Sequence, residues 1–369
     1  MKPVEIDGSY GEGGGQILRT AVGLAAVTGR AVRVDRIRAG RPRPGLAAQH
    51  LTAVRAVAEI CGGRLTGDTL ASQTLLFEPQ APPAAGDYAW DVADARPGGS
   101  AGAVSLVLQA VVPALAVARE DSRLHIAGGT HMAWSPPFDY LRDVWVPMLE
   151  GIGITVAVEL EAWGWFPVGQ GRVAAQIGVP KAIRGLRLEE RGRLLRVFGR
   201  AVAANLPAHI PQRMAARAES LLGAAQIPVQ VWPERVRAAC PGAGIFLTAE
   251  YEACRAGFSA IGEVGRSSEE VAEEAVSTLL AHRNCGAALD VHLADQLLPL
   301  LALADSPSSF TTERVSRHLT SNAYVVERFG LAEIVVESGT SHARVHVMPL
   351  ERFPHAAASP GISSEEVPS

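Results

Sequence analysis

The sequence is short of cysteine and lysine, and each shortage disfavours a class of protein. Its four cysteines are scattered along the chain, at Cys61, Cys240, Cys254 and Cys285. No two of them form a Cys-x-x-Cys pair, which argues against a zinc ribbon and a disulfide scaffold and fits a reducing compartment. Lysine occurs only at Lys2 and Lys181, so a substrate site built from several lysines is disfavoured.

The sequence also lacks a membrane-spanning segment and a strongly basic balance. No apolar run reaches the roughly 18–20 residues that a membrane helix needs, and the closest, residues 101–118, contains Gln109 and Pro113. Because no signal peptide precedes the first strand-like segment, we expect a cytoplasmic protein with no membrane partner. The net charge of −4 restricts any nucleic-acid site to a local patch. Residues 354–369, rich in Pro, Ser and Ala, are predicted to be disordered.

What the sequence does contain is a spaced internal repeat. Glycine-rich loops at residues 11–15 and 98–102 each precede an apolar helix, and a third such helix follows Leu293. Each copy continues through a strand, a second helix and closing strands. The predicted helices of the three copies span residues 16–28, 45–60, 103–118, 137–149, 294–304 and 316–329.

The third copy begins far later than the spacing of the first two predicts. Residues 184–284 are therefore predicted to form a smaller inserted α/β domain. Its predicted strands span residues 194–203, 229–232 and 245–254, and its predicted helices span 210–224 and 269–282. We expect an α+β fold, in which three repeated βαβαββ-type units form a large catalytic domain from residues 1–183 and 285–353.

The first glycine-rich loop is the strongest single string. Four glycines in five positions, directly before a helix, let backbone N–H groups approach an anion. No Lys-Ser/Thr pair follows Gly15, and Gln16 replaces the third glycine of the dinucleotide-binding motif, so neither common phosphate loop is present. A tight turn that needs positive φ explains the glycines equally well. Glu12 favours the functional interpretation, because a divalent metal, Mg²⁺ or Mn²⁺, would bridge its carboxylate to nucleotide phosphates.

A second string is rich in arginine. Five arginines lie between Arg33 and Arg43, against the single acid Asp35. Guanidinium groups suit phosphate oxygens, and the interleaved prolines and glycines stiffen the loop. A solvated basic loop is the alternative, but the neighbouring glycine loop favours phosphate binding. Arg19, one helical turn after Gln16, is expected to face the same way.

Two histidines occupy equivalent positions near helix starts, His50 in the first copy and His318 in the third. A lone helical histidine is more often structural than catalytic. The neighbours of His318 are polar instead of apolar: Ser316, Thr320, Ser321 and Asn322. A helix start also favours an anion, and a neutral imidazole there could attack a phosphate if a partner fixes its tautomer.

Asp295 and Gln296 interrupt an otherwise apolar helix. Polar side chains at such a place are costly unless they are satisfied. Capping of the helix and contact with a ligand explain these two residues equally well.

Together these strings closely resemble the RNA 3'-terminal phosphate cyclases. The matching strings are DGSYGEGGGQILR at residues 7–19, the loop at 37–45, QHLTAV at 49–54, VLQ at 107–109, GGT at 128–130, SPP at 135–137, LADQL at 293–297, HLT at 318–320 and VERF at 326–329. The likeness spans nearly the whole chain and is weakest in the predicted insert. It implies the same fold of three repeated units and one inserted domain.

The resemblance implies a three-step reaction. A histidine attacks the α-phosphate of ATP, releases pyrophosphate and carries AMP. The AMP then passes to an RNA 3'-phosphate, and the neighbouring O2' attacks that phosphate, which closes a 2',3'-cyclic phosphate and expels AMP. ATP and an RNA with a 3'-phosphate end are the implied partners, and a divalent metal is the implied cofactor.

The resemblance also implies roles for individual residues. His318 matches the family's nucleophile, and Glu12 matches its metal-contacting carboxylate. The residues that match nucleotide or phosphate contacts are Arg19, Arg38, His50, Gln109, Pro136, His292, Asp295 and Gln296. His292 stands where the family often has a tyrosine that stacks on adenine, and His131 stands where an acidic residue is common.

Three alternatives compete with this interpretation. A non-catalytic relative that acts in ribosome assembly would lack the nucleophilic histidine, so His318 argues against it. An enolpyruvyl transferase uses a similar repeat fold but needs more lysine than this chain has. A broader polynucleotide adenylase that also acts on 5'-phosphate ends stays open, because it uses the same covalent intermediate.

Overall fold

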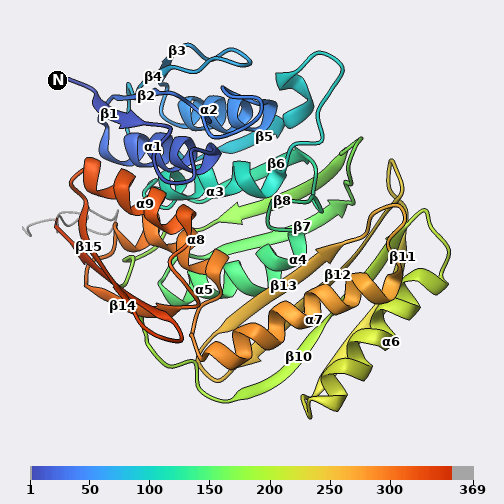
Figure 1. The fold of residues 1–369 in the computed structure, drawn as a ribbon. Coiled ribbons are helices and arrows are strands. Elements are labelled where there is room, and N and C mark those ends of the chain that lie inside the picture. Colours follow the sequence, from blue (N-terminus) through green and yellow to red (C-terminus); the bar gives the residue numbers. More distant parts are fainter. Residues whose placement is uncertain (1, 351–369) are drawn as a thin grey trace, which may run out of the picture.

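The computed structural model describes residues 2–350, which form helices and four mixed sheets (Figure 1). In chain order the elements are β1 (Val4–Asp7), α1 (Gly15–Thr28), β2 (Val32–Asp35), α2 (Ala48–Ile60), β3 (Arg64–Thr66), β4 (Leu75–Glu78), β5 (Asp87–Asp91), η1 (Val92–Ala95), α3 (Val104–Leu115), β6 (Ser122–Gly128), α4 (Phe138–Tyr140), η2 (Leu141–Trp145), α5 (Val146–Gly151), β7 (Val156–Ala162), β8 (Gly171–Ile177), β9 (Arg187–Leu188), β10 (Leu194–Ala204), α6 (His209–Ala224), β11 (Val229–Val236), β12 (Gly242–Tyr251), β13 (Arg255–Ile261), α7 (Ser268–Cys285), α8 (Val291–Leu301), β14 (Ser308–Thr312), α9 (Arg317–Arg328), β15 (Ala332–Ser338) and β16 (Ala343–Pro349). This mixture of helices and mixed sheets is compatible with the expected α+β class.

Three of the described sheets share one strand order. They run β1-β2-β4-β3, β5-β6-β8-β7 and β9-β14-β16-β15. In each sheet the first two strands are parallel and the other pairings are antiparallel. Strand β9 lies inside the segment predicted to be inserted, yet it pairs with Ser309 and Phe310 of β14. The number of repeated units and the boundaries of the insert stay predictions.

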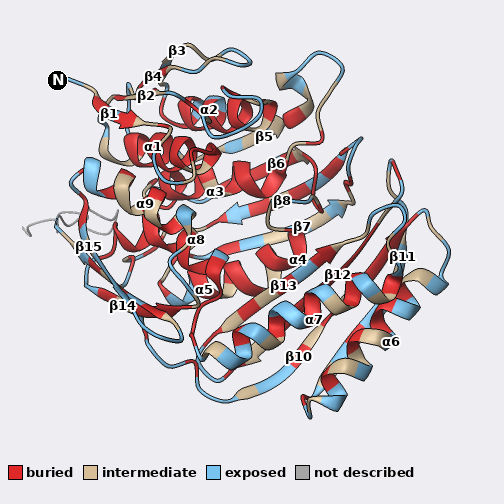
Figure 2. Ribbon diagram, viewed as in Figure 1, coloured by how far each residue is buried: buried red, intermediate tan, exposed pale blue. Residues whose placement is uncertain are grey.

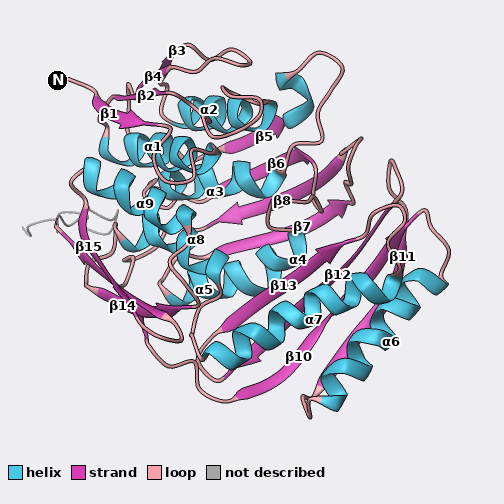
Figure 3. Cartoon of the chain, viewed as in Figure 1, coloured by secondary structure: helices cyan, strands magenta, loops and turns pink. Residues whose placement is uncertain are grey.

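Helices α1, α2, α3, α8 and α9 pack against one another between the sheets (Figure 3). Helix α1 contacts α2, α3 and α9, and α8 contacts α9. Gly23 lets α1 approach α3 closely, since a Cβ there would lie 3.1 Å from the carbonyl oxygen of Ala110. Figure 2 shows α1, α2, α3 and α8 buried over most of their length. Their starts are therefore held in fixed positions by a shared apolar core.

The fourth sheet runs β11-β10-β12-β13, with α6 and α7 side by side on one of its faces (Figure 1). The sequence predicted one strand over residues 245–254, but the chain turns there. Strand β12 ends at Tyr251, whose N–H donates to the carbonyl oxygen of Cys254 at 2.9 Å. Strand β13 then returns antiparallel to β12, and the prediction missed it because a short turn without glycine or proline gives no composition signal.

Two predicted helices differ from the observed ones at their starts or in their course. The helix predicted over residues 45–60 begins only at Ala48, because Gly45 has φ +83° and Leu46 pairs with the carbonyl oxygen of Ser72. The helix predicted over 137–149 runs as α4, η2 and α5, with a π-helical stretch at Leu141–Trp145. Such a stretch has no sequence signature that the helical periodicity would show.

Within residues 2–350, no helix is both long and apolar enough to cross a membrane. Helix α7 is long but amphipathic, with a capping box between Ser267 and Glu270 at its start. Its Arg283 lies in the last turn, where a cation suits the helix dipole. The prediction made for residues 354–369 falls outside the described part of the chain.

Candidate active site

The glycine-rich loop joins the start of α1 to the start of α9. Gly11 and Gly13 have φ values of +63° and +60°, a region that glycine enters without steric cost. A Cβ on Gly11 would overlap the Oγ of Ser321, and the N–H of Glu12 donates to that same Oγ at 3.3 Å. The loop therefore packs against α9. The positive φ and the close approach of Ser321 together explain the glycine at position 11.

The carboxylate of Glu12 folds over the start of α1. A Cβ on Gly14 would overlap this carboxylate, so glycine at the N-cap lets the Glu12 side chain fold back over the helix start. No side chain among the described residues caps that end of α1. One oxygen of Glu12 pairs with Arg41, and the other is buried without a hydrogen-bond partner in the described chain. An uncapped helix start beside an arginine is a favourable place for an anion.

His318 lies next to Glu12. It occupies the first turn of α9, after the N-cap Ser316, whose hydroxyl accepts from the N–H of Leu319 at 2.9 Å. Its Nδ1 lies 3.2 Å from the Oε2 of Glu12, although the two atoms form no hydrogen bond within the described residues. Burial and the charges of Arg19, His292 and Arg41 lower the pKa of His318 to about 4. The imidazole is therefore neutral near pH 7, with one ring nitrogen able to act as a nucleophile.

His50 lies on the other side of the loop and is held more tightly. It is 4% exposed, and the N–H of Ala47 donates to its Nδ1 at 3.3 Å. Its Nε2 faces the backbone at Gly15, where a Cβ would overlap it. Burial lowers the pKa of His50 well below its ordinary value, and the charges of three arginines add to this: Arg19, Arg38 and Arg41. Since Nδ1 accepts, the neutral ring carries its proton on Nε2 and presents a donor at the start of α1.

Two of the predicted arginines are held close to these histidines. Arg19 is 7% exposed, donates to Gln16, and has a buried Nε with no partner among residues 2–350. Burial lowers the pKa of Arg19 to about 10, against the opposing charge of Asp295, so the group stays cationic. Arg38 has φ +55° and donates to the carbonyl oxygen of Gly45 at 2.7 Å. A non-glycine residue with positive φ is uncommon and occurs mainly in constrained loops, which are often functional.

The arginine string divides into two groups. Arg33 pairs with Asp35 at 2.9 Å, and Arg36 pairs with Asp7. Both pairs lie on the outer face of the first sheet, so the interpretation that the whole string binds phosphate is too broad. Arg38 and Arg41 face the histidines. No role of its own was predicted for Arg41. Arg41 follows Gly40, whose N–H donates to the carbonyl oxygen of Gly13 in the first glycine-rich loop, and this neighbour could have singled it out.

Asp295 and Gln296 lie in the middle of α8, and the N-cap of that helix is Asp290. The capping interpretation of these two residues is therefore wrong. Gln296 accepts from the Nε2 of Gln109 at 2.9 Å, which joins α8 to α3. Asp295 is 5% exposed. Burial and the charge of Asp290 raise the pKa of Asp295 well above its ordinary value, although the charge of Arg19 opposes this.

Asn322 joins the three helices that carry these residues. It is fully buried, accepts from the hydroxyl of Thr20 on α1 at 2.7 Å, and donates to the backbone oxygen of Asp295 on α8 at 2.6 Å. The sequence flagged Asn322 only as a polar neighbour of His318. Its role needed knowledge of which helices meet, and periodicity alone does not supply that.

Pro136 and His131 stand apart from this group. Pro136 is half-buried in the turn between β6 and α4, and its place against a nucleotide stays a prediction. His131 is 1% exposed, and its Nε2 lies 2.9 Å from the Oδ2 of Asp139. Its ring stacks on Trp163, with centroids 4.4 Å apart. This pairing explains why a histidine suits position 131 without any ligand.

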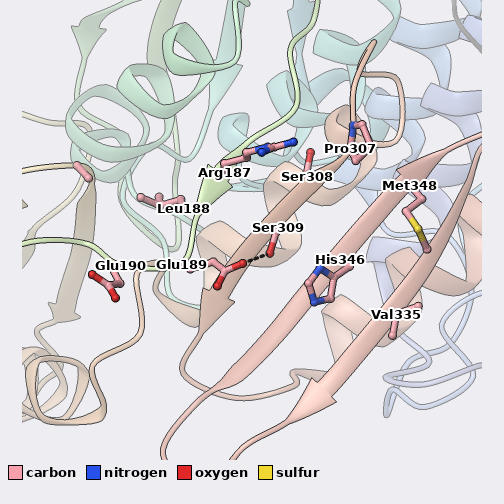
Figure 4. Close-up of a pocket in the computed structure, with 11 residues that line it drawn as sticks. Arg187, Leu188, Glu189, Glu190, Pro307, Ser308, Ser309, Val335, His346 and Met348 are labelled. Carbon is pink, nitrogen blue, oxygen red and sulfur yellow. Dashed lines mark hydrogen bonds between the residues drawn. The ribbon is translucent and has the colours of Figure 1, made fainter.

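A surface pocket of about 750 Å³ lies away from these residues (Figure 4). It opens on the sheet that contains β14 and β16, and its lining includes Leu188, Glu189, Ser309, His346 and Met348. Glu189 accepts from the hydroxyl of Ser309 at 2.6 Å, as Figure 4 shows. None of the predicted site residues lines it. We place the candidate active site at the starts of α1 and α9, where buried side-chain atoms of Glu12, Arg19 and His318 have no hydrogen-bond partner within residues 2–350; none of the buried partnerless atoms of those residues lines the pocket.

Comparisons with known proteins give the family. The family model described as RNA 3'-terminal phosphate cyclase matches residues 10–336. A protein of that name from Methylococcus capsulatus is 55% identical over 353 residues, which cover 95% of this chain and 98% of the relative. Another from Trichormus variabilis is 53% identical over 333 residues, covering 90% of this chain and 96% of the relative.

A solved structure of the enolpyruvyl transferase NikO from Streptomyces tendae aligns over 95% of this chain and 66% of that chain, with a TM-score of 0.26 and 12% identity. Similarity at this level carries no argument. The family model and the relatives agree over nearly the whole chain, including the glycine-rich loop, α8 and the start of α9. This chain belongs to the RNA 3'-terminal phosphate cyclase family.

Proposed function

We propose that this protein uses ATP to convert an RNA 3'-terminal phosphate to a 2',3'-cyclic phosphate. The reaction runs through a covalent histidine–AMP at His318 and an RNA–adenylate anhydride. The observation that carries the proposal is a neutral, partly accessible His318 beside Glu12 and the uncapped start of α1. A nucleophile, an anion-binding helix start and several cations converge there.

In the first step, a nitrogen of His318 attacks the α-phosphorus of ATP. The new N–P bond forms as the bond to the pyrophosphate oxygen breaks, and pyrophosphate leaves with the bonding electrons. Because Nδ1 lies beside Glu12, the carboxylate favours a proton on Nδ1 and leaves the lone pair on Nε2 for attack. Arg19, Arg38 and the Nε2–H of His50 oppose the negative charge of the phosphates.

In the second step, an oxygen of the RNA 3'-phosphate attacks the phosphorus of the bound AMP and frees His318. In the third, the O2' of the same ribose attacks the activated 3'-phosphorus, loses its proton, and displaces AMP. The overall change is ATP and a 3'-phosphate going to AMP, pyrophosphate and a cyclic phosphate. Adenylation makes a good leaving group of an oxygen that would otherwise leave poorly.

A divalent cation, Mg²⁺ or Mn²⁺, fits beside Glu12. The residue offers a buried carboxylate oxygen without a hydrogen-bond partner in the described chain. No group of three His, Cys, Asp or Glu side chains within residues 2–350 could hold an ion by itself. A magnesium-like ion is commonly bound by a single carboxylate together with phosphate and water oxygens. When bound, it would neutralise phosphate charge, and Glu12 would hold it.

We assign the adenosine side of ATP to the start of α8 and its neighbours. His292 lies in the first turn of α8, and its charge is felt at His318. The Gln109–Gln296 pair and Asp295 offer polar groups about one turn further on. Pro136 would supply an apolar wall. A site that reads phosphates and an RNA end gives little base specificity.

The broader polynucleotide adenylase is the alternative function, and it shares the first step. A 5'-phosphate end could accept AMP from His318 as a 3'-phosphate does, but it has no neighbouring hydroxyl placed to form a five-membered ring. We place the activity in the cytoplasm, where the four thiols, all free in the described structure, would stay reduced.

Labelling with ATP tests the proposal. Wild-type protein incubated with α-labelled ATP and Mg²⁺ or Mn²⁺ should carry label after denaturing electrophoresis, acid-labile and alkali-stable. The His318→Ala variant should carry none, a loss of at least about 10⁴-fold, while matched His125→Ala should label as wild type. Equal labelling of His318→Ala and wild type would refute the assignment.

RNA ends separate the two functions. An RNA with a labelled 3'-phosphate should become resistant to a phosphomonoesterase, because a cyclic phosphate is a diester. An RNA with a labelled 5'-phosphate should end as a stable adenylated product if the broader activity is present. Label on His318 without resistance at 3' ends would favour the adenylase.

A further inference from the structure

The carboxylate of Asp290 accepts hydrogen bonds from distant parts of the chain. It is 1% exposed, and its Oδ1 accepts from the N–H groups of His292 at 3.0 Å and Leu293 at 2.9 Å. The hydroxyl of Tyr140 lies 2.9 Å from the same oxygen. The N–H of Gly257 donates to Oδ2 at 3.2 Å. Three separate segments therefore meet at one buried side chain: α4, β13 of the fourth sheet, and α8.

The contact between Tyr140 and Gly257 is equally specific. A Cβ on Gly257 would overlap the ring of Tyr140, so glycine is needed for the ring to pack there. Burial and the charge of Asp290 raise the pKa of Tyr140 well above its ordinary value, which keeps the hydroxyl a donor. Tyr140 therefore lies between the backbone of β13 and the carboxylate of Asp290, which caps α8.

Helix α8 does not need Tyr140 for its own capping. The two backbone N–H groups that Asp290 accepts already satisfy the start of the helix in the usual way. The donors from Tyr140 and Gly257 are additional, and they tie the helix start to other elements. Their effect is to fix where α8 begins and how it is rotated, since a hydrogen bond has a defined length and direction.

We propose that Tyr140 and Gly257 are positioning residues for the nucleotide pocket, acting through Asp290 on the start of α8. His292, Asp295 and Gln296 all lie within the first two turns after Asp290, so a shift of the helix start displaces all three. A displacement of about 1 Å is enough to weaken binding or reaction severely. The fourth sheet thereby contributes to ATP binding although it carries none of the predicted contacts. This inference rests on the proposed function.

The decisive variant is Tyr140→Phe, which keeps the ring on Gly257 and removes one donor. Its matched control is Tyr251→Phe, because the hydroxyl of Tyr251 is buried and has no hydrogen-bond partner among the described residues. ATP binding is measured by calorimetry, and adenylation of His318 is measured over a range of ATP concentrations. Tyr140→Phe should raise the half-saturating ATP concentration about tenfold and leave the rate at saturating ATP nearly unchanged. Tyr251→Phe should match wild type in both.

Wild-type ATP dependence in Tyr140→Phe would overturn the inference. So would a variant whose only defect is a smaller folded fraction, with normal ATP binding by the folded molecules. Asp290→Asn provides a second variant if Tyr140→Phe does not fold: its amide oxygen can still cap α8 and accept from Tyr140, but its amide nitrogen cannot accept from the N–H of Gly257. The same tenfold rise is expected for it, and normal ATP binding would again overturn the inference. If wild type binds ATP but never labels, the proposed function fails, while calorimetry still decides the role of Tyr140.

Discussion

The polar clusters around His318 and His131, both within residues 2–350, differ in how completely their polar atoms are paired. The first lies where the glycine-rich loop meets α9. Its Glu12 Oε2, Arg19 Nε and His318 Nδ1 are all buried without hydrogen-bond partners within residues 2–350. Three such atoms in one small region are unusual, because most buried polar groups in folded proteins are satisfied.

The second cluster lies where β6 and α4 meet the fourth sheet. Both nitrogens of His131 are engaged, at 2.8 Å from the hydroxyl of Thr130 and 2.9 Å from Asp139. Asp139 also accepts from Arg142 at 3.0 Å and from Arg200 at 2.8 Å. Arg200 further lies over the ring of Trp163. Within residues 2–350, both ring nitrogens of His131 and both carboxylate oxygens of Asp139 thus have protein partners.

The difference separates a site from a structural joint. A buried polar atom without a partner costs about 1–3 kcal/mol, and a bound ligand that supplies the partner offsets that cost. At the first cluster, ATP phosphates and a cation would supply the missing partners. At the second, the protein supplies them all, and the cluster holds the fourth sheet against the second. Three predictions, from the largest effect to the smallest, test this contrast.

The first concerns His50, which belongs to the unpaired cluster but is not its nucleophile. We expect His50→Ala to slow adenylation of His318 about 100-fold, because it removes one donor aimed at the start of α1. Label should still accumulate on His318 with time, which distinguishes His50 from the nucleophile. The measurement is the single-turnover rate of label transfer at saturating ATP.

His125→Ala is the control, since its side chain is 62% exposed and lies on the second sheet. It should react at the wild-type rate. A wild-type rate in His50→Ala would indicate that His50 has only a structural role. The functional residues would then be limited to those of the glycine-rich loop, α1 and α9.

The second prediction compares two arginines of one loop. Arg38 faces His50, and Arg36 pairs with Asp7 at 2.9 Å on the outer face. Arg38→Ala should raise the half-saturating concentration of ATP or of the RNA end about tenfold, the usual cost of losing a hydrogen bond to a charged group. Arg36→Ala should change neither, because surface ion pairs contribute little. Normal kinetics of Arg38→Ala with both substrates would contradict phosphate binding by this loop and favour the alternative of a solvated basic loop.

Much of the fold could be read from the sequence because its signals are local. Gly62 and Gly330, both with positive φ, follow the ends of α2 and α9, and apolar periodicity gives α1, α3 and α8 within a few residues. Strand β13 and the pairing of β9 with β14 could not be predicted. The first follows a turn without the usual turn residues, and the second joins segments more than 100 residues apart in sequence.

The candidate site divides in the same way. Glu12, Arg19 and His318 stand in strings whose chemistry is visible, and the structure brings them together. Asp290 and Asn322 could not be found, because their side chains act between helices that the sequence does not place relative to one another. The sequence noted His131 only as standing where the family often has an acidic residue, and its partner Asp139, eight residues on, gave no local signal. Sequence patterns report elements and motifs, whereas these contacts depend on packing.

The third and smallest prediction concerns how the cluster around His131 makes the free energy of unfolding depend on pH. Burial lowers the pKa of His131 below its ordinary value, and the charges of Arg200 and Arg142 add to this, against the opposing effect of Asp139. An unfolded histidine titrates near about 6.5. Below that pH the unfolded chain binds a proton that the folded chain does not, so the free energy of unfolding falls as pH falls. The contribution is fully present above about pH 6.5 and amounts to at most about 1.4 kcal/mol per pH unit.

Urea unfolding at about pH 7.5 and about pH 5.5 checks this. Wild type and the exposed control His125→Asn should lose stability over this range by nearly the same amount. His131→Asn should be less stable at both values, because it breaks a buried pair, but should lose less between them. An equal loss in all three proteins would mean that His131 takes up its proton in the folded state as readily as in the unfolded one. Its contact with Asp139 would then be a charged pair, and complete pairing would no longer distinguish this cluster from the one at His318.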